Sequence, residues 1–393
     1  MKALTKISIG FLSLAAVALG FTSCSSEDVA QNGGGLNEKD QRVLLLSVNT
    51  GNLGTRSALT DDEKQINDMT VGIYDKSGNY RVVAKLASGA EDKEASGTKS
   101  GTFTTGSGVK VKVVTSTLQE NDQVLVAVNR GTAAFTSNPN SPTKFSEETM
   151  DATTALQFKA SSTDIDATKF PKFGTATLPT GSNSTFTANV NVKNLVSKVT
   201  LEDLKVEFSG PYASATFTPE EIFLLNVPDK LAFSATGQAS TSSYLNGTKI
   251  DKTGGNTGVK TDVLAKAITD ASALGSGTAS YTAQPILYTI PNSSTSNKTI
   301  LVIAGNFKTD GSGAGKTVYY PLALNEDYST DPSGAAADGG TKSQTLAGKN
   351  YKCNVVIKTI GASNPWVTTG PQTAVLTVNV EDWVDATQTT TFE

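Results

Sequence analysis

The stretch Gln41-Arg-Val-Leu-Leu-Leu-Ser-Val-Asn49, with Thr55-Arg56-Ser57 shortly after it, carries the most information about this chain. Its run of apolar and β-branched residues predicts a β-strand. Because the strand lies upstream of Arg56, cleavage after that arginine would remove it from a domain that had already folded around it. Near the other end, Ala374-Val-Leu-Thr-Val-Asn-Val380 alternates and predicts a second strand. One end of the chain can thus lose a strand, and the other carries a strand that could replace it.

Between these two segments the hydrophobic pattern has a period of two, which is typical of half-buried strands. The pattern recurs in segments such as 69–73, 109–113 and 186–192, and stretches rich in Gly, Ser and Thr separate them. The continuous apolar run Val124–Val128 instead predicts a strand that is buried on both faces. Many short strands, turn-rich loops and little helix predict a mainly all-β fold built from β-sandwiches.

Two short helices interrupt this pattern. Thr60 and Glu63 have the spacing of a capping box, which predicts a helix that begins there and runs through Asn67. A second helical stretch is expected from Thr261 to Asp270.

The N-terminus has the features of an export signal. Lys2 and Lys6 precede the apolar segment 7–21, which is shorter than the roughly 20 residues that a membrane-spanning helix needs. The segment ends in Phe21-Thr-Ser-Cys24, which is similar to a bacterial lipoprotein signal with Cys24 as the lipidated first residue. Cys353 is the only other cysteine, so no intramolecular disulfide is expected. Cys353 is predicted to be a buried apolar residue in a strand.

The length of chain after Arg56 is large for one sandwich, so two domains are expected. The predicted limits are 1–24 for the signal peptide, 25–56 for a propeptide that contains the removable strand, 57–195 for an N-terminal β-sandwich domain, and 196–393 for a C-terminal β-sandwich domain with a donor strand near 374–393.

The composition excludes several classes of function. The chain contains no histidine, which rules out serine–histidine and cysteine–histidine catalysis and zinc sites with histidine ligands. We therefore expect no enzyme activity. The net charge is −4 and no basic stripe is present, so nucleic acid is not an expected partner. The only arginines are Arg42, Arg56, Arg81 and Arg130, and two of them would remain after cleavage at Arg56. Such scarcity suits a chain that must survive an arginine-specific protease.

Two segments are close to ligand-binding motifs without meeting their requirements. Asp310-Gly-Ser-Gly-Ala-Gly-Lys-Thr317 is near a phosphate-binding loop, but Asp310 stands where glycine is needed and a strand is predicted where a helix should follow. A Gly-rich hairpin loop is expected instead. Asp61-Asp62-Glu63 lacks the ligand spacing of an EF-hand and suits the start of a helix. Calcium binding in the loops that contain aspartate stays open. No metal site and no cofactor is predicted.

Several segments, taken in order, resemble the fimbrillin family, the type V pilins of Bacteroidales, and within it the major subunits. They are Thr55-Arg56 before the capped helix, Met69–Asp75, Val124–Asn129, Pro219–Val227, Tyr319–Pro321 and the closing Val380–Gln388, which is the most specific. The resemblance implies two transthyretin-like β-sandwich domains, removal of the N-terminal segment by an arginine-specific protease, and polymerisation by strand exchange. The acidic Ser25-Ser-Glu-Asp28 is similar to signals that send lipoproteins to the outer face of the outer membrane.

The residues expected to act in such an assembly fall into four sets. They are Cys24 for lipidation; Arg56 and Ser57 for cleavage; Val43, Leu45, Leu46 and Val48 in the displaced propeptide strand; and Ala374, Leu376, Val378 and Val380 in the donor strand, whose end Trp383, Val384 and Phe392 would anchor. The alternative for the last set is that it completes the fold of its own domain. The implied partners are identical subunits in a head-to-tail polymer, accessory and anchor fimbrial subunits, and the protease.

The leading hypothesis is therefore a structural pilin subunit, which starts as an outer-membrane lipoprotein precursor and becomes part of an extracellular fimbria that supports adhesion and biofilm formation. One alternative is an accessory or tip fimbrial adhesin. The other is a monomeric carbohydrate-binding surface lipoprotein. The receptor or ligand stays open.

Overall fold

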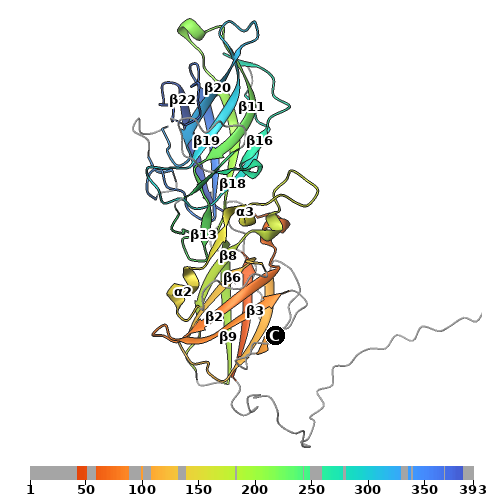
Figure 1. Ribbon diagram of the computed structural model, residues 1–393, viewed down its shortest axis with the longest axis vertical. Helices are drawn as coiled ribbons and strands as arrows, with labels where there is room; N and C mark the ends of the chain where they lie inside the picture. Colours follow the sequence, from red (N-terminus) through yellow and green to blue (C-terminus); the bar gives the residue numbers. More distant parts are fainter. Residues whose placement is uncertain are drawn as a thin grey trace, which may run out of the picture. The chain divides into compact units, whose positions relative to one another are not determined.

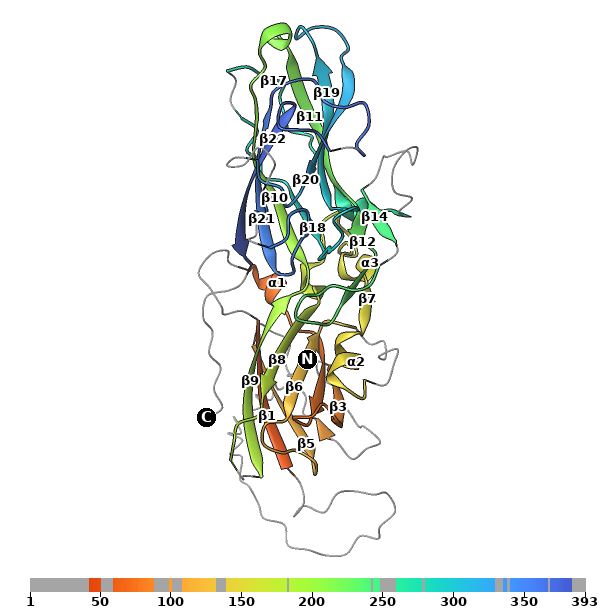
Figure 2. The same ribbon diagram turned by 90° about the vertical axis from the view of Figure 1, so that its left-hand side faces the viewer.

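The structure is a computed structural model (Figures 1 and 2) that describes part of the chain. The described residues are 42–50, 59–87, 99–100, 108–131, 139–181, 184–241, 243–247, 259–277, 280–328, 335–337, 340–366 and 368–383. Strands dominate and the helices are short, so the predicted all-β sandwich fold is confirmed.

The first half of the described chain forms an eight-stranded sheet with the order β3-β2-β6-β8-β9-β1-β5-β4. Its strands are β1 (Arg42–Thr50), β2 (Asp68–Tyr74), β3 (Tyr80–Ala87), β4 (Lys99–Ser100), β5 (Gly108–Thr115), β6 (Gln123–Val128), β8 (Lys172–Thr177) and β9 (Thr185–Asn194). The order of the strands places the first strand of the chain in the interior of the sheet, between β9 and β5 (Figure 2).

One face of this sheet encloses its own apolar core. Alternate residues point into it, as the period of two predicts, for example Val109, Val111 and Val113 of β5. Strand β6 is buried on both faces, because Val126 joins this core while Leu125 joins a second core on the other side. The prediction for the run Val124–Val128 is confirmed.

The second half of the described chain forms two larger sheets. One has the order β18-β10-β21-β22, and the other has the order β16-β11-β19-β20 with β17 also paired to β11. Their strands are β10 (Ser197–Val206), β18 (Ile286–Thr289), β21 (Lys349–Ile357), β22 (Ala374–Asp382), β11 (Thr216–Leu225), β16 (Ala265–Ala267), β17 (Leu274–Gly275), β19 (Ile300–Lys308) and β20 (Lys316–Ala323). Side chains of both sheets share one hydrophobic core.

Smaller pairings complete the fold. A three-stranded sheet contains β12 (Val227–Pro228), β14 (Tyr244–Asn246) and β15 (Val259–Lys260), and β13 (Lys230–Ala232) pairs with β7 (Thr149–Asp151). The chain passes from the eight-stranded sheet to β10 through Leu195 and Val196, and both side chains are fully buried. The Gly-rich segment 310–315 connects β19 and β20 as the predicted hairpin loop, and Cys353 is buried in β21.

The helices are α1 (Asp61–Lys64), α2 (Pro142–Ser146) and α3 (Ala152–Ala155), with 3-10 turns at Ala167–Lys169, Gly210–Tyr212 and Asp262–Leu264. The capping box between Thr60 and Glu63 is present, as predicted. The helix ends at Lys64 rather than at Asn67, because the carbonyl of Gln65 accepts hydrogen bonds from Asn129 and Lys172 instead of continuing the helix.

The prediction of a helix from Thr261 to Asp270 is wrong. The segment holds one 3-10 turn followed by β16, in which Ala265 pairs with Phe223 of β11. Pairing with an existing sheet outweighs the local helix preference of this Ala- and Lys-containing stretch.

Candidate functional site: the removable strand and the carboxyl-terminal strand

Strand β1 is bonded on both sides. It runs antiparallel to β5, with Leu46 opposite Val111, and parallel to β9, with Leu46 opposite Ala188. Leu44, Leu46 and Val48 are fully buried in the core of the eight-stranded sheet. Full burial of three aliphatic side chains contributes about 5–9 kcal/mol, so loss of this strand would leave the sheet split and its core open.

The two faces of β1 differ in burial. Leu46 and Val48 face the core, whereas Val43 and Leu45 point to the opposite face and are half-buried. Leu44 was not among the predicted residues of this strand, although counting back by twos from Val48 and Leu46 would have placed it on the core face. Cys24, Arg56, Ser57, Val384 and Phe392 lie outside the described residues.

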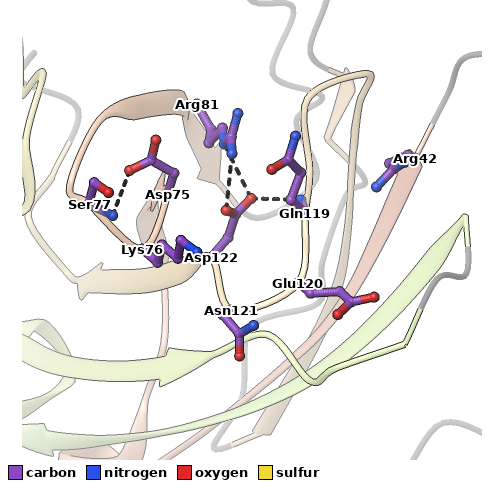
Figure 3. A pocket seen from close by; sticks show the side chains of 9 residues that line it. All are labelled: Arg42, Asp75, Lys76, Ser77, Arg81, Gln119, Glu120, Asn121 and Asp122. Carbon is purple, nitrogen blue, oxygen red and sulfur yellow. Dashed lines mark hydrogen bonds and ion pairs between the residues drawn. The ribbon is translucent and has the colours of Figure 1, made fainter.

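A polar hollow of about 470 Å³ lies near the start of β1, and several of the side chains that line it have partners within the fold (Figure 3). Asp122 accepts hydrogen bonds from the backbone N–H of Gln119 (2.8 Å) and from Arg81, which also forms an ion pair with it. Burial raises the pKa of Asp122, and these donors oppose that rise. Arg42 donates to the carbonyl of Leu118 (2.7 Å). The hollow therefore holds fold contacts of β1 and its neighbours.

Strand β22 lies at the end of its sheet and pairs with β21 alone. Ala374, Leu376 and Val378 point into the core of their own half, while Val380 packs partly against it. Near the end of the strand two cross-strand ion pairs add to the ladder, between Lys349 and Asp382 (2.6 Å) and between Lys352 and Glu381 (3.1 Å). Within this chain, β22 completes its own sheet.

Trp383 ends the described chain as a fully buried side chain. Its ring stacks on Tyr288 with centroids 5.8 Å apart and meets Phe170 edge-on at 5.8 Å. The Nζ atom of Lys198 lies 5.7 Å from the ring centroid, within cation–π range. The backbone N–H of Trp383 donates to the carbonyl of Gly348 (2.9 Å).

A buried carboxylate joins this aromatic cluster to α1. Glu63 accepts hydrogen bonds from Tyr288 Oη (3.2 Å) and from the backbone N–H of Thr60 (2.8 Å), and pairs with Lys198 Nζ (3.4 Å). Burial is the main cause that raises the pKa of Tyr288, and the negative charge of Glu63 raises it further. The hydroxyl group therefore stays protonated and donates a hydrogen bond to Glu63. We call Glu63, Lys198, Tyr288, Phe170 and Trp383 the Glu63 cluster. It connects the segment that follows Arg56 with the end of β22.

A second buried polar group, the ammonium of Lys172, holds the backbone directly after α1. Lys172 Nζ donates to the carbonyls of Gln65 (3.1 Å) and Phe170 (2.9 Å), and the side chain of Asn129 donates to the same two carbonyls. Burial lowers the pKa of Lys172 to about 7, and the charges of Glu63 and Asp68 oppose that change. The Glu63 cluster and Lys172 were not predicted from the sequence, because the capping box indicates the start of a helix and does not indicate that the carboxylate of Glu63 is buried.

The helices among the described residues are all too short to span a membrane. The described residues also contain no cluster of three or more His, Cys, Asp or Glu side chains that could hold a metal ion.

Comparison with known proteins gives matches among solved structures. A candidate cell adhesion protein from Bacteroides eggerthii has a TM-score of 0.59 at 16% identity, and the match covers 91% of this chain and 99% of that one. A fimbrilin (FimA) from Porphyromonas gingivalis has a TM-score of 0.57 at 15% identity, with 88% and 99% covered. A candidate cell adhesion protein from Parabacteroides distasonis has a TM-score of 0.56 at 15% identity, with 87% and 99% covered. No family model and no curated protein matches the chain.

These matches extend over nearly the whole length of the solved chains. At such low identity they establish the fold, which is that of fimbrillins and related adhesion proteins. The resemblance to fimbrillins that the sequence indicates is therefore confirmed for the fold.

The buried ammonium of Lys172 predicts a pH dependence of stability. Its folded pKa of about 7 lies below the ordinary value of 10.5, so between these pH values the unfolded chain binds a proton that the folded chain does not. The free energy of unfolding should therefore rise from about pH 7 to about pH 10, and Lys172→Met should remove that rise. Denaturant unfolding at both pH values measures it, with exposed Lys112→Met as the control. An unchanged pH slope in Lys172→Met would contradict the assignment.

The Glu63 cluster predicts that a change beside α1 loosens Trp383. Glu63→Ala leaves Lys198 and Tyr288 without their buried acceptor and should cost about 3–5 kcal/mol. It should also shift the Trp383 emission to longer wavelength, which is best measured in a Trp366→Phe background where Trp383 is the only tryptophan. The matched control is Asp61→Ala, whose side chain is fully exposed and which should cost less than about 1 kcal/mol. Equal effects of the two substitutions would show that Glu63 does not support Trp383.

Proposed function

We propose that this chain is a structural subunit of a surface fimbria and belongs to the fimbrillins. It would be exported as a lipoprotein precursor anchored through Cys24, cut after Arg56, and polymerised by insertion of the C-terminal strand of one copy into the next. The single observation that carries this proposal is the position of β1, which lies inside a sheet and only a few residues upstream of Arg56.

Removal of β1 would create a defined acceptor groove between β5 and β9. Both strands would then present unpaired N–H and C=O groups, and core residues such as Val111 and Ala188 would face water. An exposed strand edge beside an apolar groove is a template for strand addition. The driving force for assembly is the free energy gained by filling the groove minus the free energy lost when β22 leaves its own sheet, where Leu376 is fully buried.

Strand β22 has the features of a donor. It lies at an edge of its sheet, and its inward side chains Ala374, Leu376 and Val378 are apolar and alternate. Because the donor and the groove are different surfaces, the contact is heterologous and generates an open filament. Dissociation would require a core strand to leave its sheet, so the polymer should be kinetically stable.

The remaining arginines support selective cleavage. Arg81 is ion-paired with buried Asp122, and the side chain of Arg130 is 5% exposed and pairs with buried Glu148 at 3.1 Å. Arg42 lies within β1 and donates to the carbonyl of Leu118. A protease that binds extended substrate would have to unfold strands or break buried ion pairs to use these sites, which favours Arg56.

The remaining parts of the proposal follow from the same scheme. The mature subunit would consist of two domains, 57–195 and 196–393, since β9 and β10 belong to different sheets on either side of Leu195. Its partners would be identical subunits, accessory and anchor subunits, and the arginine-specific protease. The cell surface would be its location, and adhesion, with biofilm formation, its role.

Protease treatment of the non-lipidated precursor tests the proposal. N-terminal sequencing should find a new terminus at Ser57, and an unboiled SDS gel should show a ladder that disappears on boiling. Arg56→Lys, which keeps the charge but removes the cleavage site, should stay uncut and monomeric. A chain truncated before Trp383 should be cut without forming the ladder. Clean cleavage with a monomeric product would contradict a stalk subunit and would favour a tip adhesin or a monomeric binding lipoprotein.

A further inference from the structure

Strands β1 and β22 share a short sequence pattern that occurs nowhere else in the chain. β1 contains Leu46-Ser-Val-Asn49, and β22 contains Leu376-Thr-Val-Asn379. In both strands the Leu and the Val point into a core: Leu46, Val48 and Leu376 are fully buried and Val378 is 5% exposed. The two segments therefore match in composition, in spacing and in the face that each residue presents.

The surroundings of β1 show what each position of this pattern requires. Leu46 lies opposite Val111 and Ala188, and Val48 lies opposite Val109 and Val190, all of which are core residues. The positions on the other face are restrictive as well. Ser47 is fully buried between its neighbours Lys110 and Asn189, and Asn49 is only 4% exposed. The groove thus selects residues on both faces of the strand that fills it.

We infer that β22 of a second copy takes the position of β1 in the same direction and register, with Leu376 in place of Leu46 and Val378 in place of Val48. The inserted strand would run antiparallel to β5 and parallel to β9, as β1 does. Thr377 would replace Ser47, and Asn379 would replace Asn49. This inference rests on the proposed function and adds to it the orientation and register of the subunit contact.

Other registers fit the groove less well. A slip by one residue turns Thr377 and Asn379 toward the core. A slip by two toward the C-terminus keeps the apolar alternation but places Asn379 in the small, fully buried Ser47 position and the carboxylate of Glu381 in the buried Asn49 position. A slip by two in the other direction brings Gln372 to the position of Leu44, which is fully buried.

The reverse direction also fits less well. It would keep Thr377 in the Ser47 position, but it would place Val375 where the buried amide of Asn49 lies.

The residue opposite position 379 differs between these arrangements and therefore distinguishes them. Position 379 would lie opposite Asn191 in the inferred register, opposite Asn189 after the slip toward the C-terminus, and opposite Thr187 in the reverse direction.

Disulfide trapping tests the inference in the full non-lipidated precursor. Three variants combine Asn379→Cys with Asn191→Cys, Asn189→Cys or Thr187→Cys, and all four positions are exposed in the single chain. After cleavage and mild oxidation, boiled non-reducing gels are compared with reducing gels. Neighbouring Cα atoms on paired strands are close enough for a disulfide. All variants also carry Cys353→Ala, because Cys353 lies opposite Val378 of β22 and loses that cover when β22 leaves its own sheet.

The expected result is a boiling-resistant ladder, lost on reduction, for Asn379→Cys with Asn191→Cys and not for the other two pairs. A ladder from either of the other pairs, or polymers without a covalent ladder from any pair, would overturn the register and leave the proposed function intact. Failure of the protein without added cysteines to polymerise after cleavage would instead overturn the proposed function, and the inference with it.

Discussion

The pairing of β1 with β5 on one side and β9 on the other is the constraint on which the first half of this fold depends. An interior strand holds two parts of the sheet together and covers the core beneath it, so its loss leaves two new unpaired edges. Leu44, Leu46 and Val48 are all fully buried there. The folded precursor therefore depends on a segment that a single cut near Arg56 would separate from the rest of the chain.

The segment that follows the proposed cut is held in place by different means. Glu63 joins it to Lys198 and Tyr288, and Lys172 holds the carbonyl of Gln65. These contacts do not involve β1, so they would persist after its departure. The new N-terminus would remain attached close to the cut, while Trp383 at the end of β22 packs against the same cluster. In the single chain, the segment that follows the proposed cut and the end of β22 thus have a common structural support.

Much of this organisation can be predicted from the sequence, because strands with apolar residues at a period of two reveal themselves locally. Strand β22 was predicted this way, whereas β1 and β6 were predicted from their runs of apolar residues. The position of β1 between β5 and β9 depends on residues about 60 and 140 positions away, which no local pattern specifies. Likewise, the capping box predicted that Glu63 begins a helix but not that its carboxylate meets Tyr288. The helix expected at 261–270 failed because sheet pairing with β11 decides its structure.

The most direct test of the central claim is hydrogen exchange of the amides of β5 and β9 in three states: the intact precursor, the cleaved monomer at low concentration, and the polymer. The account predicts that amides of β5 and β9 that β1 protects in the precursor exchange rapidly after β1 is released, and regain protection in the polymer, while those of β2 and β6 change much less. Unchanged protection of β5 and β9 after cleavage and release of β1, or protection that does not return in the polymer, would contradict it.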